Sequence, residues 1–373
     1  MDADDVDIEM RLLPPRKVLV IGASIGAGHN SAAWELQRRL QCNGLSAVYF
    51  DILDAVPFIF KVILCDLYGP IVNYAPSLFS RFMASWESDS SWTVRILLWS
   101  VSTRKVLEQI RGASVVVTTH AIATQAVGRL KQQGKHEAVI VSYFCDAGIH
   151  QLLFHQEVDL NLVPVPEAVQ QCAKYGHTAV AITPLVQSKF RSPVPQHTCY
   201  RLRQRLGLAA ESAVILIVAG SLGIGSVGST VSDILDQMEA VLIVVLCGRN
   251  STLQRSLSTI PRVTALGWRE DISELLAIAQ AMVHNAGGMA VWEAMVTGLP
   301  ATTYNPLPGH GMANARALEQ SGLSPWPRDR RDLRLALEHA LQMGRREPTI
   351  EDEQVVVDHI ARMMQRANDI TLL

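Results

Sequence analysis

Short apolar runs without polar alternation recur along the first half of the chain. The first run, Lys17–Gly22, is followed by a glycine-rich loop and then by apolar residues at helical spacing over His29–Leu40. Runs of this kind, rich in valine and isoleucine, are typical of strands buried on both faces of a parallel sheet. Strand, glycine loop and helix together form the opening unit of a doubly wound α/β domain. We predict three further strands at Ala47–Asp51, Ser114–Thr118 and Ala138–Tyr143.

The same order of elements restarts after a polar stretch that contains several prolines. This stretch, Pro184–His197, is typical of a linker. After it, Ser212–Ala219 predicts a strand, Gly220–Gly228 forms a second glycine loop, and Ala240–Cys247 predicts another strand. We therefore expect two similar doubly wound domains.

The length of 373 residues suits two domains. We place the boundary in the linker, with residues 1–190 as the first domain and residues 191–373 as the second. The segment Glu351–Asp369 carries apolar residues near helical spacing and predicts a closing amphipathic helix. This final helix is a candidate to pack back on the first domain.

Composition narrows the class of protein. The chain is 49% apolar and 18% charged, with a formal net charge of −2, and it lacks the clustered lysines and arginines of a nucleic-acid binder. The six cysteines are scattered and predict neither a zinc site nor a disulfide framework. The N-terminus does not read as a secretory signal, and prolines and charges interrupt the most apolar window, residues 55–74. We expect a soluble, cytoplasmic protein.

The two glycine loops each satisfy a motif of another enzyme class. The run Gly223–Gly228 fits the G-x-G-x-x-G dinucleotide fingerprint, but the next strand ends near Arg249 without the acidic residue that binds ribose. Since an arginine suits a 2′-phosphate, an NADP-dependent oxidoreductase stays open. The run Gly22–Gly26 fits G-x-S-x-G, but a hydrolase would place this serine later in the chain.

The stretch His284–Asn314 is the most informative part of the sequence. Paired glycines, Gly287 and Gly288, follow a predicted strand, Ala281–His284, and lead into a helix that starts near Met289. The free N–H groups and the positive dipole of a first helical turn suit a phosphate. Glu293 lies about one turn further along, where a carboxylate can reach the two hydroxyls of a ribose. A second short strand, Ala301–Tyr304, and another helix follow.

Several segments, in this combination and order, resemble the inverting GT-B glycosyltransferases related to the monogalactosyldiacylglycerol synthases and to MurG, a glycosyltransferase family 28-like group. The segments are Gly22–His29, Gly220–Gly228, Cys247–Asn250, Leu266–Ile272 and His284–Asn314. The resemblance covers most of the chain. It implies the GT-B fold, in which two Rossmann-like, doubly wound domains face a cleft, with the acceptor on the N-terminal domain and the nucleotide sugar on the C-terminal domain.

The resemblance also implies a UDP-sugar donor and the residues that bind it. Backbone N–H groups of Gly287, Gly288 and Met289 would hold the diphosphate, and Glu293 would bind the ribose. The implied donor-binding residues are Gly26, Gly28, Ser221, Gly223, Arg249, Trp268, Gly287, Gly288, Met289, Glu293, His310 and Asn314. Relatives often carry glutamine with a second polar residue where this chain has His310 and Gly311, so the donor sugar stays open.

For catalysis, the resemblance implies a single displacement with inversion and without a metal or other cofactor. His29 matches the histidine that ends the first glycine loop, a candidate for the base or for stabilising the departing diphosphate. An imidazole is partly neutral near pH 7 and can accept a proton from a hydroxyl. Asp146 and His150 match an Asp and His that follow a first-domain strand, and they are further candidates for base or acceptor contact.

The acceptor is indicated by an apolar, aromatic segment with basic residues at 55–82. In lipid-modifying relatives the matching region helps to meet the membrane, so we expect a lipid-linked or amphiphilic acceptor and peripheral contact at the inner face of the membrane. Three alternatives stay open: a glycosyltransferase of phosphoglycolipid antibiotic biosynthesis, a sugar-nucleotide epimerase and the oxidoreductase. No nucleic-acid partner is expected.

Overall fold

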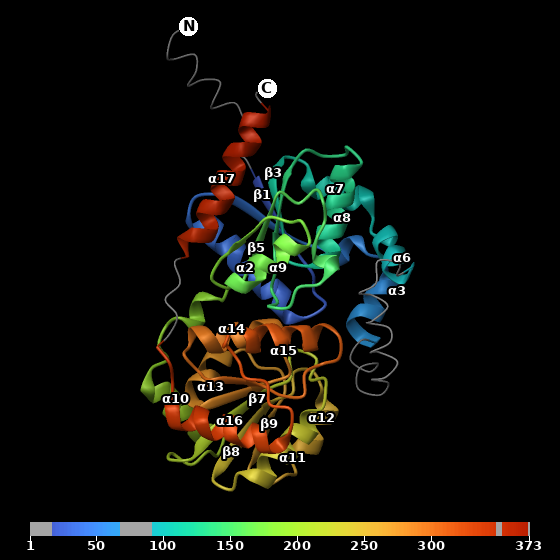
Figure 1. Ribbon diagram of the computed structural model, residues 1–373. Coiled ribbons are helices and arrows are strands. Elements are labelled where there is room, and N and C mark those ends of the chain that lie inside the picture. The colour runs from blue at the N-terminus through green and yellow to red at the C-terminus, as the bar shows by residue number, and fades with distance from the viewer. Residues whose placement is uncertain (1–16, 68–91, 348–352, 372–373) are drawn as a thin grey trace.

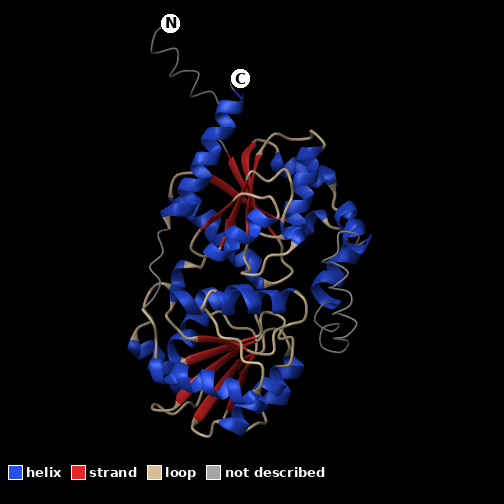
Figure 2. Ribbon diagram, viewed as in Figure 1, coloured by secondary structure: helices blue, strands red, loops and turns tan. Residues whose placement is uncertain are grey.

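A computed structural model describes residues 17–67, 92–347 and 353–371. Within these residues the chain forms two parallel sheets, each flanked by helices, and the two units stack one on the other (Figures 1 and 2). The strand order is β2-β1-β3-β4-β5-β6 in the first sheet and β11-β10-β7-β8-β9 in the second. This confirms the predicted fold class of two doubly wound α/β domains.

The first sheet contains the four strands that the apolar runs predicted, each within one residue of its predicted bounds. Its strands are β1 (Lys17–Gly22), β2 (Ser46–Asp51), β3 (Ala113–Thr118), β4 (Val139–Tyr143), β5 (Leu160–Val163) and β6 (Ala179–Ala181). In the register, Val20 of β1 lies between Tyr49 of β2 and Val117 of β3. The last two strands were not predicted, because Asn161 interrupts the apolar run of β5 and β6 has only three residues.

Helices cover both faces of the first sheet. They are α2 (Ala27–Cys42), α3 (Phe58–Lys61), α6 (Trp92–Ser100), α7 (Thr103–Ile110), α8 (Ala121–Gln132) and α9 (Pro166–Lys174), with a π-helical turn η2 (Val62–Leu67) after α3. The predicted helical stripe of α2 is fully buried at Ala33, Leu36 and Leu40. These side chains join the core under β1 and β3, which explains the helix, since tertiary packing supplies most helical stability.

The second unit is likewise a parallel sheet with helices packed on it. Its strands are β7 (Ala213–Val218), β8 (Val241–Leu246), β9 (Val263–Leu266), β10 (Ala281–His284) and β11 (Ala301–Thr303). Its helices are α10 (Gln196–Arg205), α11 (Val227–Gln237), α12 (Ser251–Leu257), α13 (Ile272–Ile278), α14 (Gly288–Val296), α15 (His310–Gln320) and α16 (Arg330–Met343). Helices α14 and α15 lie on the side that meets the first unit (Figure 1).

The chain passes between the two units twice. The outgoing passage contains a short 3₁₀ turn, Ser188–Phe190, in the stretch predicted as a linker. After the return, α17 (Gln354–Thr371) packs against β3 and β4 of the first sheet, with Val356, Val357 and Ile360 buried (Figure 1). The predicted closing helix is thus present, apart from its first residues, which lie outside the described part of the chain.

A cluster of charges fastens both passages to α2. Buried Glu35 pairs with buried Arg39 (Oε1 to Nε, 2.9 Å) and with Arg38 (Oε1 to Nη2, 2.7 Å). Glu353, just before α17, pairs with Arg38 (2.9 Å) and with Arg191 of the outgoing passage. Buried charges are stable only when they are paired. The cluster therefore holds the two passages at one place on the first unit.

Candidate active site

Each sheet has a point where the order of strands reverses. In the first sheet β1 lies between β2 and β3, and in the second β7 lies between β8 and β10. The loops that leave two such neighbours run to opposite faces of the sheet and open a crevice at the carboxyl ends of the strands, where ligands bind in doubly wound folds. Both predicted glycine loops begin at these points, after β1 and after β7.

The two glycine-rich regions meet between the units. A Cβ atom added to Gly28 would lie 2.8 Å from Cγ of Met289, at the start of α14. One added to Gly26 would lie 3.8 Å from Oγ of Ser221. Real Cβ atoms do not approach other atoms to 2.8 Å, so a side chain at Gly28 would require the Met289 side chain to move. The structure thus brings together four predicted donor-binding residues from both halves of the chain.

The second glycine loop is tied to the end of β8. Gly223 has a φ of +57°, which favours glycine, and a Cβ there would overlap the carbonyl oxygen of Cys247. Its own carbonyl accepts a hydrogen bond from Nδ2 of Asn250 (2.8 Å). The G-x-G-x-x-G pattern therefore reflects close backbone packing inside the second unit.

Arg249 and Trp268 lie beside the second glycine loop. The backbone N–H of Arg249 donates to the carbonyl of Ser221 (2.9 Å), and its guanidinium lies over the Trp268 ring, 5.0 Å from the ring centre. Both side chains are exposed. This cation–π pair places a positive charge and an aromatic ring beside the second glycine loop.

The start of α14 carries no side-chain cap. Gly287 is the N-cap residue, and among the described residues no side chain accepts a hydrogen bond from the first-turn N–H groups. These groups and the helix dipole therefore remain available to an anion. The carboxylate of Asp146 lies at the same place, because a Cβ on Gly288 would overlap its Oδ1 atom. A candidate catalytic residue of the first unit thus faces the predicted diphosphate site of the second.

Glu293 lies one turn further along α14. The side chain is half-buried, and in the described part of the chain its carboxylate has neither a hydrogen bond nor an ion pair. Burial raises the pKa of Glu293 to about 7, against the opposing effect of the positive charge on Lys189. A half-buried carboxyl group without such partners is suited to accept hydrogen bonds from a ligand.

Asn314 joins the two units directly. Its Oδ1 accepts a hydrogen bond from the backbone N–H of Gly148 (2.6 Å), and its Nδ2 donates to the carbonyl of Ala286 (3.2 Å). The side chain is buried. Nearby, Nε1 of Trp292 donates to the carbonyl of Cys145 (2.8 Å), again across the units. The amide of Asn314 therefore fixes the loop that precedes α14 against the loop that follows β4.

His29 lies in the first turn of α2 with a defined tautomer. Its Nδ1 is 2.9 Å from the carbonyl oxygen of Thr119, at the end of β3. A carbonyl can only accept, so Nδ1 carries the proton and Nε2 keeps a free lone pair. The ring of His120 meets the ring of His29 edge-on, with ring centres 4.7 Å apart. His29 is therefore arranged to accept a proton at Nε2.

Four histidines gather where the units meet. Burial lowers the pKa of His120 well below its usual value, and His29, His150 and His310 lower it further. Burial and His310 lower the pKa of His150 to about 4. The predicted residues His29, His150, Asp146 and His310 are thus close together. His120 was missed by the sequence analysis, although a histidine between a buried strand and a helix was a usable signal.

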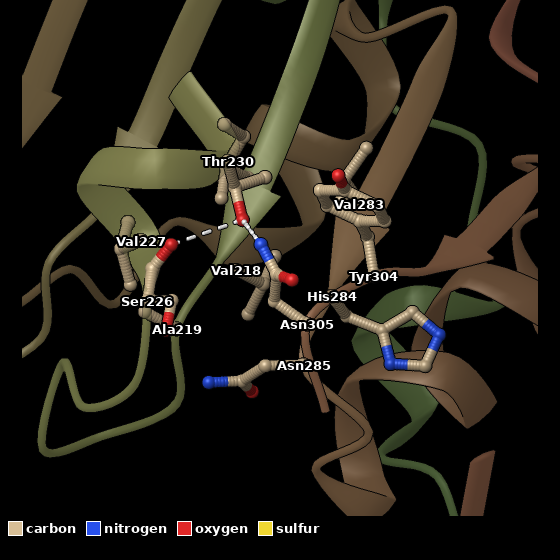
Figure 3. A pocket seen from close by; sticks show the side chains of 11 residues that line it. Val218, Ala219, Ser226, Val227, Thr230, Val283, His284, Asn285, Tyr304 and Asn305 are labelled. Carbon is tan, nitrogen blue, oxygen red and sulfur yellow. Dashed lines mark hydrogen bonds between the residues drawn. The ribbon is translucent and has the colours of Figure 1, made fainter. Parts of the chain in front are cut away.

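A small pocket lies behind the second glycine loop, at the carboxyl ends of β7 and β10 (Figure 3). There Thr230 Oγ1 donates to the carbonyl of Ser226 (3.1 Å) and accepts from Nδ2 of Asn305 (3.1 Å). The ring of His284 turns away from these groups, and its Nδ1 accepts from the N–H of Ala286 (3.1 Å). Burial lowers the pKa of His284 to about 4. Through its hydrogen bond to Ala286, the neutral ring holds the turn that leads into α14.

Comparison with known families fits this geometry. Residues 29–185 match the monogalactosyldiacylglycerol (MGDG) synthase family, and residues 214–352 match the glycosyltransferase family 28 C-terminal domain. The chain belongs to the family 28-like glycosyltransferases. Membership in this group makes the protein a glycosyltransferase.

Individual relatives agree with this membership. The glycosyltransferase is 25% identical over 321 residues to the processive diacylglycerol beta-glucosyltransferase of Bacillus pumilus, covering 82% of each chain. Among solved structures, it resembles MurG of Acinetobacter baumannii (TM-score 0.53, 18% identity, covering 94% of this chain and 100% of that one). It also resembles a Medicago truncatula enzyme complexed with UDP-glucose (TM-score 0.57, 13% identity, covering 96% and 95%). These likenesses confirm the GT-B fold.

The segment predicted to meet lipid is described only in part. Residues 55–67 are described, whereas residues 68–82 lie outside the described part of the chain. Several large apolar side chains are exposed on α3, η2 and α6, among them Phe58 (80% exposed) and Trp99 (75% exposed). Within the described residues, no helix has the length and apolarity that crossing a bilayer demands.

Proposed function

We propose that this glycosyltransferase transfers a sugar from a UDP-sugar to a hydroxyl of a lipid-linked or amphiphilic acceptor, with inversion at the anomeric carbon. The main observation in its favour is the contact between the uncapped start of α14 and the first glycine loop that carries His29. The acceptor class is supported by the relative that acts on diacylglycerol, and the donor class by the structural neighbour with UDP-glucose.

We divide the work between the two units as the resemblance implies. Residues 1–190 would bind the acceptor, and residues 191–373 would bind the donor. In the donor unit, the N–H groups of Gly288 and Met289 would hold the diphosphate, because no side chain in the described part of the chain caps them. Glu293 would accept hydrogen bonds from the ribose hydroxyls. Arg249 and Trp268 would border the base.

The remaining assignments concern the sugar. His310 begins α15, and it is an electrostatic neighbour of His120 and His150, so it belongs to the group of histidines where the units meet. We propose that it borders the donor sugar. Asn314 would act through the loop it fastens, since both ends of its amide are engaged. Asp146 and His150 remain further candidates on the acceptor side.

The proposed reaction is one displacement. The acceptor oxygen attacks the anomeric carbon, and the bond from that carbon to the diphosphate oxygen breaks on the opposite face. The hydroxyl proton passes to Nε2 of His29, whose Nδ1–H remains bonded to Thr119. The electron pair leaves with UDP, where the first-turn N–H groups and the dipole of α14 stabilise the new charge. These groups supply the stabilisation that a metal gives in other enzymes, and we propose that no metal is required.

A transfer assay and a thermal-shift assay test this function. We expect transfer from an α-linked UDP-sugar to diacylglycerol in mixed micelles, with a β-linked product and full activity in excess EDTA. UDP should raise the melting temperature more than GDP or TDP, because a ligand that binds only the folded state stabilises it. A retained anomeric configuration would contradict the single displacement, and magnesium-dependent rescue after EDTA would contradict metal independence. Conversion of the UDP-sugar without acceptor would indicate an epimerase.

We also propose peripheral contact with the cytoplasmic face of a membrane through the exposed apolar side chains of α3, η2 and α6. These elements pack on the same core cluster of the first unit, so their exposed residues belong to one region. Exposed aromatic and aliphatic side chains of this kind bury into the headgroup region of a bilayer.

Flotation with anionic liposomes checks this proposal. The double variant Phe58→Ser and Trp99→Ser should float several-fold less than the unaltered protein, because about 1.5–3 kcal/mol of burial is lost for each large apolar side chain. Leu335→Ser is the matched control, since Leu335 is similarly exposed on α16 of the other unit. Equal loss in the control, or an unaltered protein that does not float, would contradict the membrane contact.

A further inference from the structure

The segment Thr119–His120 makes three separate contacts with His29. The Thr119 carbonyl accepts from Nδ1 of His29 (2.9 Å), and Thr119 Oγ1 donates to the backbone carbonyl of His29 (3.2 Å). The His120 ring packs edge-on against the His29 ring, with ring centres 4.7 Å apart. This segment follows β3, the neighbour of β1 at the point where the strand order reverses. The segment Thr119–His120 therefore contacts both the ring and the backbone of the first histidine of α2.

The ring of His120 is itself held by the backbone. Its Nδ1 accepts a hydrogen bond from the N–H of Ile122 (3.1 Å), which makes His120 the N-cap of α8. An Nδ1 that accepts cannot carry the proton, so the proton is on Nε2. In the part of the chain that the structure describes, this Nε2 has no hydrogen-bond partner. The cap thus fixes both the orientation and the tautomer of His120 before it meets His29.

We propose that His120 is a positioning residue for His29 in glycosyl transfer. Its ring would keep the imidazole of His29 in the orientation that gives Nδ1–H to Thr119 and leaves Nε2 unbonded. This inference rests on the proposed role of His29 as the base. His120 is not assigned any contact with the substrate.

Two physical reasons favour this role. A histidine side chain can occupy several staggered rotamers, and a base displaced by about 1 Å loses on the order of 100-fold in rate. A ring fixed at 4.7 Å restricts these alternatives. In addition, burial keeps the His120 ring neutral. A neutral neighbour allows His29 to become positive during the reaction, whereas a second imidazolium would oppose that charge.

Two substitutions separate the cap of α8 from the ring contact. His120→Asn keeps the cap, since the asparagine oxygen can accept from Ile122 N–H, but it removes the ring. His120→Phe keeps an aromatic ring beside His29 and removes the cap. We expect His120→Asn to lower kcat about tenfold, with an unchanged KM for the UDP-sugar and an unchanged melting temperature. We expect His120→Phe to keep most of kcat and to melt at a lower temperature.

Nitrogen-15 NMR of the histidine rings gives a readout that does not depend on activity. In the unaltered protein His29 should show a single tautomer with the proton on Nδ1, and in His120→Asn it should show a mixture of both tautomers. A single Nδ1–H tautomer in His120→Asn together with unaltered kcat would overturn the proposal. If His29→Ala retained full activity while the tautomer mixture still appeared in His120→Asn, the failure would lie with the proposed base and not with the positioning contact.

Discussion

Replacing His29 with alanine is expected to lower kcat by about three orders of magnitude while donor affinity stays within about twofold. The general base contributes on the order of 10²–10⁴ to such a reaction, and His29 holds its lone pair at Nε2 because Thr119 occupies Nδ1. Most of the proposed donor contacts, including those to the diphosphate and the ribose, come from the other unit, so binding of UDP should change little. Steady-state kinetics with saturating acceptor, together with calorimetric titration of UDP, measures both quantities.

The control variant separates the loss of the base from the loss of the hydrogen bond between His29 and the Thr119 carbonyl. His29→Asn carries a side-chain amide that can donate to the Thr119 carbonyl, yet it cannot accept a proton. It should be as inactive as His29→Ala and as stable as the unaltered protein. Trp34→Phe changes an exposed residue on the same helix and should stay fully active. Turnover of His29→Asn within a few-fold of the unaltered enzyme would remove His29 from the role of base.

Replacing Glu293 with alanine is expected to weaken UDP binding about 100-fold. A hydrogen bond to a charged group is worth about 1.5–3 kcal/mol, and two ribose hydroxyls can share this carboxylate. Since the contact is made equally before and during the reaction, kcat at saturating donor should fall much less than affinity. Calorimetric titration of UDP into each variant measures the loss. Glu338→Gln, which removes an exposed charge on α16, is the matched control.

The raised pKa of Glu293, about 7 in the free protein, gives this prediction a pH signature. Hydroxyl donors favour the ionised carboxylate, so binding lowers the pKa and releases a proton from the fraction that is still protonated. UDP affinity should therefore weaken as the pH falls through about 7 and level off above it. Titrations in buffers of different ionisation enthalpy count the released proton. Glu293→Gln should release none from this site, and a UDP affinity that is constant across this range would contradict the assignment.

The strands were predictable where burial on both faces leaves an unbroken apolar run. Lys17–Gly22 and Ala281–His284 agree with the structure residue for residue. The half-buried strand Ala179–Ala181 has only three residues and leaves no such pattern. The start of α14 was also predictable, because paired glycines and a following helix are local features whose chemistry does not depend on distant parts of the chain.

The contact of His120 with His29 could not be predicted from a local pattern in the sequence. A reader of the sequence sees a histidine after a buried run, but nothing there says that β3 pairs with β1 and not with β2. The strand order decides that pairing, and with it the contact between His120 and His29. The charge cluster of Glu35, Arg191 and Glu353 has the same origin, since its members are far apart in the sequence.

The sequence by itself determined the two repeated units, their glycine loops and the start of α14, whose first-turn N–H groups suit a phosphate. These features follow from hydrophobic periodicity and from backbone geometry within a few residues. Only the tertiary structure decided which of these parts face each other. Gly28 contacts Met289, and Asp146 lies against Gly288, because two separately folded sheets meet at the carboxyl ends of their strands. That meeting depends on contacts between distant segments, which no local pattern records, and it brings His29 opposite the proposed donor site.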